Sequence, residues 1–318
     1  MIFQKLIFKL ARSIVKLIMP CLATLFIKLK INRRIINILN DKSHNANNYY
    51  NFNKFISSQI KEEKLIALDV GAQGGFNSDK YIANKYERFF APILVEPISK
   101  EYKKLKNLSK KVLDKGFWSS PLKKKIYILG NRSGSSSMYE PDETNFKIHN
   151  IKDKDYVNFD VTETVEVDCD TIDNSLEKLN IREIDYLKID TQGSELEILK
   201  GMRKYKPLLI RLEAHIFSMY KNVPNWTELI KHLDESSYIP CDWKGIGSHV
   251  TRIPAEMDII FIPNFKIDLG KKLIFKNKEK FICLMLIFGQ LDLLKAIAQE
   301  IDILPNDFFN KFKDRYFF

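Results

Sequence analysis

Residues 65–75 read LIALDVGAQGG, a strand-like run that ends in a glycine-rich turn. Further along the chain, residues 186–195 read YLKIDTQGSE and repeat the order of strand, carboxylate, glycine and helix start. Each stretch places a carboxylate, Asp69 or Asp190, at the carboxyl end of a predicted buried strand. Open α/β sheets bind ligands at this edge. The two stretches together therefore predict an enzyme that uses a cofactor.

Strand-like and helix-like patterns alternate up to residue 264, which predicts an α/β fold with a mostly parallel sheet covered by helices on both faces. We expect strands at residues 65–70, 92–95, 111–114, 125–129, 164–167, 184–190, 207–213 and 257–262. We expect helices at residues 52–61, 77–88, 99–108, 172–179, 193–205 and 225–234. The expected organisation is a basic segment with a linker at 1–45, one domain at 46–264 and a helical tail at 265–318.

The positive charge of the chain is concentrated at its beginning. The formal net charge is +11, but residues 1–40 hold eight basic side chains and no acidic one, which leaves 43 basic and 40 acidic residues in the rest. This argues against nucleic acid as a partner, because a nucleic-acid surface needs basic residues on the folded domain. One face of a predicted N-terminal helix carries Lys5, Lys9, Arg12 and Lys16. We expect this amphipathic helix to lie on an anionic membrane surface, and packing on the domain is the alternative.

The sequence indicates neither a membrane span nor secretion. The uncharged run at residues 17–27 is shorter than the roughly 20 residues that cross a bilayer, and no small-residue cleavage site follows it. The four cysteines are far apart and form no C-x-x-C pair, so neither a disulfide framework nor a zinc site is indicated. The expected location is the cytoplasm, with peripheral attachment to the inner face of a membrane.

Two further segments leave alternatives open. The tail at residues 265–318 is apolar with helical spacing, which suits a cap on the domain, a dimer contact or a second membrane-contacting element. Residues 130–137 read GNRSGSSS and form a polar loop. We interpret that loop as a surface connection, with a lid over the site as the alternative.

The turn after the first strand has the pattern D-x-G-x-x-x-G. Gly71 allows a tight turn, and Gly75 lets the backbone approach a ligand closely. The pattern differs from the dinucleotide-binding G-x-G-x-x-G. An acid two residues before the first glycine suits a ligand with an ammonium group, such as the methionine end of S-adenosylmethionine. The following predicted strand ends in Glu96-Pro97, and an acid there can accept hydrogen bonds from both ribose hydroxyls of an adenosine cofactor.

These motifs resemble the FkbM-type family of S-adenosylmethionine-dependent methyltransferases. Residues 69–75 are similar to the family's cofactor loop, with Gln73 where asparagine is more usual, and residues 95–97 are similar to its ribose-binding strand end. Further similar segments follow in order at residues 116–119, 135–137, 171–173, 187–201, 210–215 and 219–220. The resemblance covers roughly residues 50–264, and it implies a Rossmann-like methyltransferase fold.

The resemblance also implies methyl transfer from S-adenosylmethionine to an oxygen atom of a small-molecule or glycan acceptor, commonly a sugar. The candidate cofactor-binding residues are Asp69, Gly71, Gln73, Gly75, Glu96, Pro97 and Asp190. The candidate catalytic residues are Asp190, Glu195, Glu213 and His215. A hydroxyl nucleophile must lose its proton, and Asp190 at its strand end is the leading candidate base. Helix capping is the alternative role of Asp190.

The remaining candidates have alternatives of their own. Glu195 falls in the first turn of a predicted helix, where the helix dipole stabilises a carboxylate. Glu213 and His215 are two residues apart and therefore share one face of a strand, although a lone histidine is more often structural. Oxygen ligands at Asp190, Glu195 and Glu213 suit magnesium, but their spacing does not require it, and we predict no obligatory metal.

Two other functions compete with methyl transfer. A nicotinamide-dependent oxidoreductase would use the same sheet, but the missing G-x-G-x-x-G pattern disfavours it. A membrane-associated scaffold with a vestigial methyltransferase domain would have no need of carboxylates at three strand ends, and the chain retains all three. The sequence gives no indication of the oligomeric state.

Overall fold

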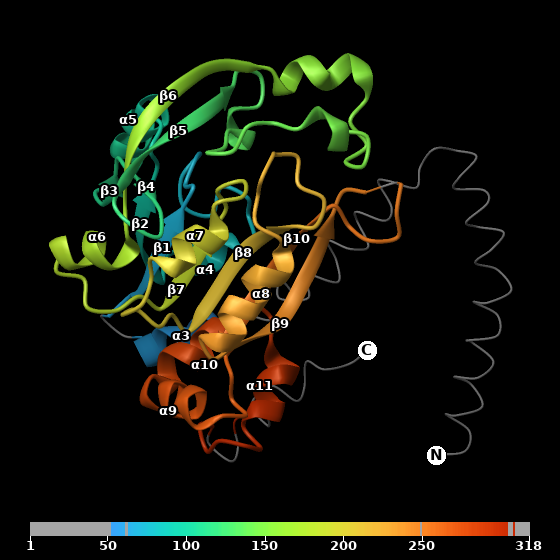
Figure 1. The fold of residues 1–318 in the computed structure, drawn as a ribbon. Coiled ribbons are helices and arrows are strands. Elements are labelled where there is room, and N and C mark those ends of the chain that lie inside the picture. Colours follow the sequence, from blue (N-terminus) through green and yellow to red (C-terminus); the bar gives the residue numbers. More distant parts are fainter. Residues whose placement is uncertain (1–51, 61–62, 249, 305–307, 309–318) are drawn as a thin grey trace, which may run out of the picture. The chain divides into compact units, whose positions relative to one another are not determined.

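The computed structural model describes residues 52–60, 63–248, 250–304 and 308 (Figure 1). The chain forms two compact units, residues 1–51 and residues 52–318. The predicted amphipathic helix at residues 1–40 lies outside the described residues, and so does the end of the chain at 309–318. Among the helices that are described, none combines the length and the hydropathy needed to cross a bilayer.

Within the described residues, the second unit is built on a sheet of seven strands in the order β3-β2-β1-β7-β8-β10-β9 (Figure 1). All pairs from β3 to β8 are parallel, whereas β10 is antiparallel to both β8 and β9. The strands span Leu65–Val70 (β1), Phe90–Val95 (β2), Val112–Leu113 (β3), Tyr186–Ile189 (β7), Leu209–His215 (β8), Tyr238–Ile246 (β9) and Glu256–Pro263 (β10). The prediction of a mostly parallel α/β sheet is confirmed.

The order of the strands reverses between β1 and β7. From β1 the sheet extends through β2 and β3 on one side, and through β7 and β8 on the other. Val70 pairs with Ile189 in the strand register, so the turns that follow these two strands leave the sheet side by side. Open α/β sheets bind ligands at such a switch point. The two stretches that identified the fold therefore meet where a ligand is expected.

Helices lie on both faces of the sheet. The helices span Asn53–Ile60 (α3), Asn84–Glu87 (α4), Ser99–Leu108 (α5), Ile172–Lys178 (α6), Glu195–Lys200 (α7) and Trp226–Glu235 (α8). Apolar side chains of α6, α7 and α8 pack against Leu68, Ile189 and Leu212 of the sheet. Leu105 of α5 packs against Leu94 in a separate cluster. The alternation of side chains along each strand supplies these two buried faces.

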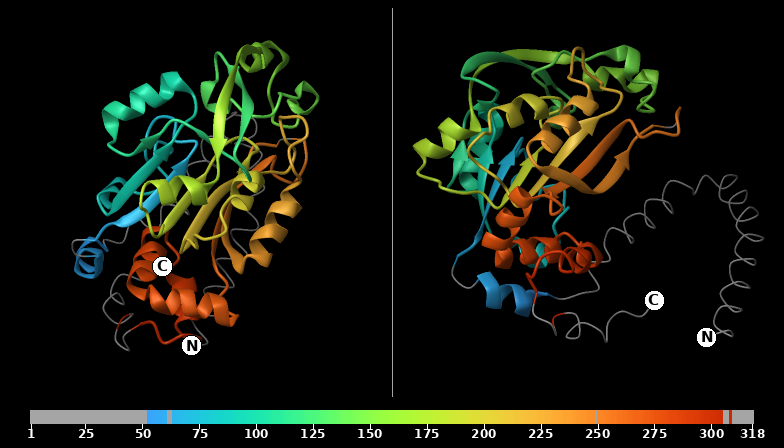
Figure 2. Two further views of the ribbon diagram at one scale, coloured as in Figure 1. Left: turned by 60° about the vertical axis from the view of Figure 1, so that its left-hand side comes forward. Right: turned by 60° about the horizontal axis from the view of Figure 1, so that its bottom comes forward.

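Three helices follow the last strand: α9 (Asp268–Lys276), α10 (Lys278–Ile287) and α11 (Leu291–Ile297). Residues 281–287 of α10 are all buried, as expected of a helix that is apolar all round. Lys280 Nζ lies 3.3 Å from Oδ1 of Asp185, just before β7, and the Phe288 and Tyr186 rings lie 5.0 Å apart. These helices therefore contact the amino-terminal end of the parallel strands, away from the switch point (Figure 2).

A second, three-stranded sheet in the order β4-β6-β5 is inserted between β3 and β7. Its strands span Gly116–Phe117 (β4), Leu122–Leu129 (β5) and Val161–Asp170 (β6). Residues 125–129 and 164–167 were expected in the main sheet, and this expectation is wrong. Much of β6 is exposed, which an antiparallel pair tolerates and a central parallel strand does not. Figure 1 shows this sheet over the carboxyl-terminal side of the main one.

The predicted helix at residues 77–88 is largely absent, and α4 covers only its last part. Asn77 and Lys80 have φ of +56° and +57°, values that a right-handed helix excludes. The Asn77 side chain closes this turn with two hydrogen bonds to the backbone of Ile82, both 2.7 Å long. The long segment between β1 and β2 is therefore mostly a loop. It places Asp79 beside Arg211 of β8, with which Asp79 forms an ion pair.

Two other boundaries differ from the prediction. Helix α7 ends at Lys200 instead of residue 205, and Gly201 is its C-cap. Gly201 lies against the backbone, because a Cβ atom there would be 2.3 Å from the Trp118 carbonyl oxygen. Strand β9 was not predicted, and it contains Pro240. Proline is tolerated there because β9 is the edge strand of the sheet.

Candidate functional site

An open cavity lies at the switch point, and its space of about 610 Å³ includes solvent at the mouth. The turns after β1 and β7, the end of β2 and the inserted segment with the second sheet form its walls. Of the predicted site residues, the wall includes Gly71, Gln73, Glu96, Pro97 and Asp190. Those that are not on it are Asp69, Gly75, Glu195, Glu213 and His215. The structure thus brings most of the cofactor candidates together and places three of the four catalytic candidates behind the wall.

Gly71 fixes the contact between the two turns. Its φ is +79°, and a Cβ atom at this position would lie 1.9 Å from the carbonyl oxygen of Asp190. The Gly71 amide donates a hydrogen bond of 3.1 Å to the Val95 carbonyl. A side chain at Gly71 would therefore separate the turns after β1 and β7 and open the cavity.

Replacing Gly71 with alanine is expected to lower the free energy of unfolding by about 2–3 kcal/mol, because a left-handed backbone and a backbone clash act together. Gly75→Ala is the matched control. Gly75 has φ of +98°, but the nearest atom to a Cβ there is Leu108 Cδ1 at 3.8 Å, so only the backbone term of about 1–2 kcal/mol applies. Urea denaturation measures both variants. Equal losses of unfolding free energy in the two variants would show that the clash with the Asp190 carbonyl adds nothing to the cost of Gly71→Ala.

Glu96 places a buried carboxylate on the cavity wall. Its side chain follows β2, and its Oε1 accepts a hydrogen bond of 2.9 Å from the Ile98 amide. Burial, with a smaller contribution from the negative charge of Glu101, raises the pKa of Glu96 to about 7. The second carboxylate oxygen can accept a hydrogen bond from a ligand. A hydroxyl donor is the partner that would offset the cost of burying this group.

Asp69 lies beneath the wall and is paired with a lysine of the same sheet. Asp69 stands beside Lys188 in the strand register, and Lys188 Nζ lies 3.3 Å from Asp69 Oδ1 and 3.5 Å from Asp190 Oδ2. Burial raises the pKa of Asp69 against the opposing effect of Lys188. The carboxylates raise the pKa of Lys188 although its burial opposes them, so the lysine stays charged. Lys188 therefore contacts both Asp69, which is buried beneath the wall, and Asp190, which faces the cavity.

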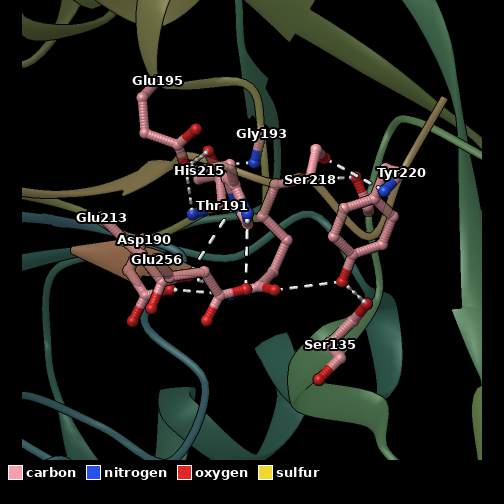
Figure 3. A network of polar contacts seen from close by, with 12 residues as sticks. Ser135, Asp190, Thr191, Gly193, Glu195, Glu213, His215, Ser218, Tyr220 and Glu256 are labelled. Atoms are coloured by element: carbon pink, nitrogen blue, oxygen red, sulfur yellow. Dashed lines mark hydrogen bonds and ion pairs between the residues drawn. The ribbon is translucent and has the colours of Figure 1, made fainter. Parts of the chain in front are cut away.

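The turn after β7 is held by Gln192, which sequence analysis did not single out. Its Nε2 donates to Asp190 Oδ1 at 3.2 Å and to Glu213 Oε1 at 2.9 Å, and its Oε1 accepts from the Tyr220 hydroxyl at 3.0 Å. Ser137 Oγ donates to its carbonyl oxygen at 2.6 Å. Gln192 thus links the cavity wall to the acids behind it, and Figure 3 shows three of its partners, Asp190, Glu213 and Tyr220.

The Glu195 side chain makes its hydrogen bonds within the same turn. Its Oε1 accepts hydrogen bonds from the Thr191 amide at 2.9 Å, the Thr191 hydroxyl at 3.0 Å and the Gly193 amide at 3.3 Å. The carboxylate is buried, and burial raises its pKa. This arrangement supports a positioning role for Glu195, in which it fixes the backbone that carries Asp190.

Glu213 and His215 lie on one face of β8, as their spacing predicted. Glu256 of β10 is the register partner of His215, and His215 Nδ1 lies 3.4 Å from Glu256 Oε1. Burial, together with the negative charges of Glu256 and Asp190, raises the pKa of Glu213 well above its usual value. Figure 3 shows these side chains beside Asp190. They form an acidic cluster that Gln192 connects to Asp190 on the cavity wall.

The serine-rich loop forms part of the wall. Ser133, Gly134, Ser136 and Ser137 line the cavity, and Ser133 Oγ accepts a hydrogen bond of 2.8 Å from Gln73 Nε2 of the β1 turn. The Tyr220 hydroxyl shares its one proton between Gln192 Oε1 and the Ser135 carbonyl oxygen, which is 2.6 Å away. The loop is therefore more than a surface connection, because it forms part of the cavity wall.

Sequence reasoning also missed Lys188, Tyr220 and Glu256 as members of the site. Tyr220 and Lys188 were noticed only as parts of longer motifs. Lys188 could have been found from its position. It lies on β7, two residues before Asp190, and residues two apart along a strand point to the same face of the sheet. No local signal identifies Glu256, since pairing with β8 alone brings it to His215.

Residues 69–240 match the family model described as "Methyltransferase FkbM domain". The matched region starts at the acid that ends β1 and runs into β9. It includes both turns at the switch point, the inserted sheet, and Glu213 and His215 of β8. No curated protein matches the chain.

Proposed function

The chain belongs to the FkbM family of methyltransferases, and we propose that it transfers a methyl group from S-adenosylmethionine to a hydroxyl of a sugar, glycan or glycolipid intermediate. The observation that carries this proposal is the buried carboxylate of Glu96 on the wall of a cavity at the switch point. Adenosine cofactors present two ribose hydroxyls as donors, and a carboxylate at a strand end is their usual acceptor.

The reaction is an in-line displacement. The acceptor oxygen attacks the methyl carbon as the bond from that carbon to sulfur breaks, and S-adenosylhomocysteine leaves as a neutral thioether. The hydroxyl proton goes to a base, and we assign this role to Asp190, the partly exposed acid on the wall. Because the sulfonium is already activated, orientation contributes much of the acceleration, about 7–11 kcal/mol in favourable cases.

Gly71 and Pro97 shape the cofactor end of the cavity. Because Gly71 has no side chain, the turn after β1 can approach the backbone of Asp190 closely. Pro97 and Ile98 line the wall next to Glu96. The choice of acceptor rests on the family's tendency and on the basic residues at 1–40, which suit an acceptor at an anionic surface. Incubation with labelled S-adenosylmethionine and fractionated cell-envelope material would show whether label enters polysaccharide, lipid or small molecules.

Binding of S-adenosylhomocysteine is expected to weaken as the pH falls through about 7. The ionised Glu96 accepts from the ribose hydroxyls, and its pKa of about 7 means that it is protonated below that pH. The dissociation constant should then rise by up to about tenfold for each pH unit below 7. Isothermal titration between pH 6 and pH 8.5 measures this change.

Glu96→Gln is the control for the pH effect, because the amide keeps the shape but does not titrate. We expect weaker binding at pH 8.5 and little change in affinity between pH 6 and pH 8.5. Glu101→Gln, outside the cavity wall, should keep a pH dependence with its midpoint at a slightly lower pH, because the Glu101 charge contributes to the raised pKa of Glu96. Absence of binding by the unaltered protein, or tight binding of a nicotinamide dinucleotide in its place, would contradict the proposed function.

A further inference from the structure

A group of side chains behind the cavity wall has the composition of a metal site. Glu213, His215 and Glu256 each offer one ligand atom, and these atoms all lie within 4.8 Å of one another. His215 Nε2 is 3.8 Å from Glu213 Oε1, and His215 Nδ1 is 3.4 Å from Glu256 Oε1. Ligand atoms about 2.0–2.2 Å from a tetrahedral ion lie about 3.4 Å apart. Small side-chain rotations that shorten the distances between these atoms would therefore bring all three within bonding distance of one ion.

The histidine of this group has no hydrogen-bond partner. The His215 side chain is 1% exposed, and among the described residues neither of its ring nitrogens makes a hydrogen bond, nor does Glu256 Oε1. Buried polar groups are normally paired, and each orphan costs about 1–3 kcal/mol. His215 Nδ1 and Glu256 Oε1 face each other at 3.4 Å without the geometry of a hydrogen bond, and a cation between them would satisfy both.

A second imidazole points at the same carboxylate. His149 Nε2 lies at hydrogen-bond distance from the carbonyl oxygen of Phe217, and a carbonyl can only accept, so this nitrogen carries the proton. Its other ring nitrogen, Nδ1, faces Glu256 Oε1 at 3.9 Å. Either a proton on this nitrogen or a metal ion between the two atoms would make that contact favourable. Metal-binding histidines typically donate their other ring nitrogen to a carbonyl in this way.

We propose that Glu213, His215 and Glu256, with His149 as a fourth ligand, hold a divalent transition-metal ion of the Zn²⁺ or Mn²⁺ type. A mixed set of imidazole and carboxylate ligands suits these ions, whereas Mg²⁺ prefers oxygen ligands alone. The ion would also neutralise the negative charges of the two largely buried carboxylates. The expectation of no obligatory metal rested on sequence spacing, which does not reveal that β10 and the inserted segment supply two of the ligands.

The site lies one side chain away from the cavity. Gln192 Nε2 donates both to Glu213 Oε1 and to Asp190 Oδ1. If methyl transfer is the reaction, as proposed above, the ion would act through Gln192, by fixing the amide that donates to Asp190. Metal binding itself does not depend on that proposal.

The test uses the full chain, stripped with a chelator and dialysed against Zn²⁺, Mn²⁺ or Mg²⁺ in turn. Elemental analysis should find one equivalent of Zn²⁺ or Mn²⁺ and no retained Mg²⁺. His215→Gln and Glu256→Gln should each weaken binding at least about 100-fold. His232→Gln, on α8 and away from the cluster, should bind as the unaltered protein does. If His215→Gln fails to fold, His149→Gln serves in its place, with a loss of about 10- to 100-fold.

The competing interpretation is a protonated His215 shared by two carboxylates without a metal. It predicts no retained ion in the unaltered protein, or equal retention by all variants at adventitious surface sites, and either result would overturn the proposal. Titration of S-adenosylhomocysteine into the same stripped samples keeps the two proposals separate. Cofactor binding without metal binding would overturn only the metal site, and metal binding without cofactor binding would overturn only the methyltransferase assignment.

Discussion

Replacing Lys188 with methionine is expected to lower the free energy of unfolding by about 3–5 kcal/mol. Lys188 is almost fully buried and lies 3.3 Å from Asp69 Oδ1. Asp69 is itself 1% exposed, so the substitution leaves a carboxylate in the sheet without its countercharge. Asp190 would lose its only ion-pair partner among the described residues. Denaturation with urea, followed by circular dichroism, measures the loss.

The double variant Lys188→Met with Asp69→Asn tests the cause. Removing both charges leaves no buried ion, so the double variant should recover a large part of the stability that the single one loses. Lys204→Met is the surface control. Its ion pair with Glu177 is exposed, and such pairs contribute at most about 1 kcal/mol. A loss at Lys188 no larger than at Lys204 would mean that water compensates Asp69.

The buried charges explain what sequence reasoning could and could not see at this site. The mostly apolar runs at residues 65–70 and 186–189 predicted the central strands and their carboxyl ends, because a short, nearly continuous apolar run is typical of a strand buried on both faces. An acid inside such a pattern was interpreted as a ligand contact. The structure shows that one of the two acids, Asp69, is held by a lysine of the neighbouring strand. Pairing between strands decides this, and a single sequence does not contain it.

Local turn chemistry explains the errors in the helices. Residues 77–88 have a helical spacing of apolar side chains, but Asn77 and Lys80 adopt positive φ and the segment stays a loop. The inserted sheet was missed for a different reason. β5 and β6 have strand-like patterns that are consistent with either sheet, and their antiparallel pairing with each other removes them from the main one. Local propensity predicts an element, and tertiary contacts decide which layer it joins.

The candidate site was predicted best where one strand end supplies both the backbone and the side chain. Gly71, Glu96, Pro97 and Asp190 all satisfy this condition, and all line the cavity. Glu195 and Glu213 were placed near the right turn, but their hydrogen bonds go to Thr191 and Gln192 and not to the cavity. The direction of a side chain depends on what lies across from it, and for these two acids that neighbour is the β7 turn.

Asp190→Asn is expected to slow methyl transfer by about 10²- to 10⁴-fold, the usual contribution of a general base. Asparagine keeps the size of the side chain and an oxygen that can accept the hydrogen bond from Gln192, now 3.2 Å from Asp190 Oδ1. It cannot take up the proton of an acceptor hydroxyl. The rate is measured with tritiated S-adenosylmethionine and the envelope fraction that the unaltered enzyme labels.

Affinity for S-adenosylhomocysteine separates catalysis from binding in this variant. A base that acts on the acceptor contributes little to holding the cofactor, so the affinity should fall by less than about tenfold while the rate falls much further. Glu195→Gln is the matched comparison. Its amide oxygen can still accept from the Thr191 amide, so a positioning role predicts a much smaller loss of rate than Asp190→Asn causes. If Asp190→Asn loses affinity and rate to the same extent, Asp190 binds the cofactor, and the base must be sought among the acids on the far side of Gln192.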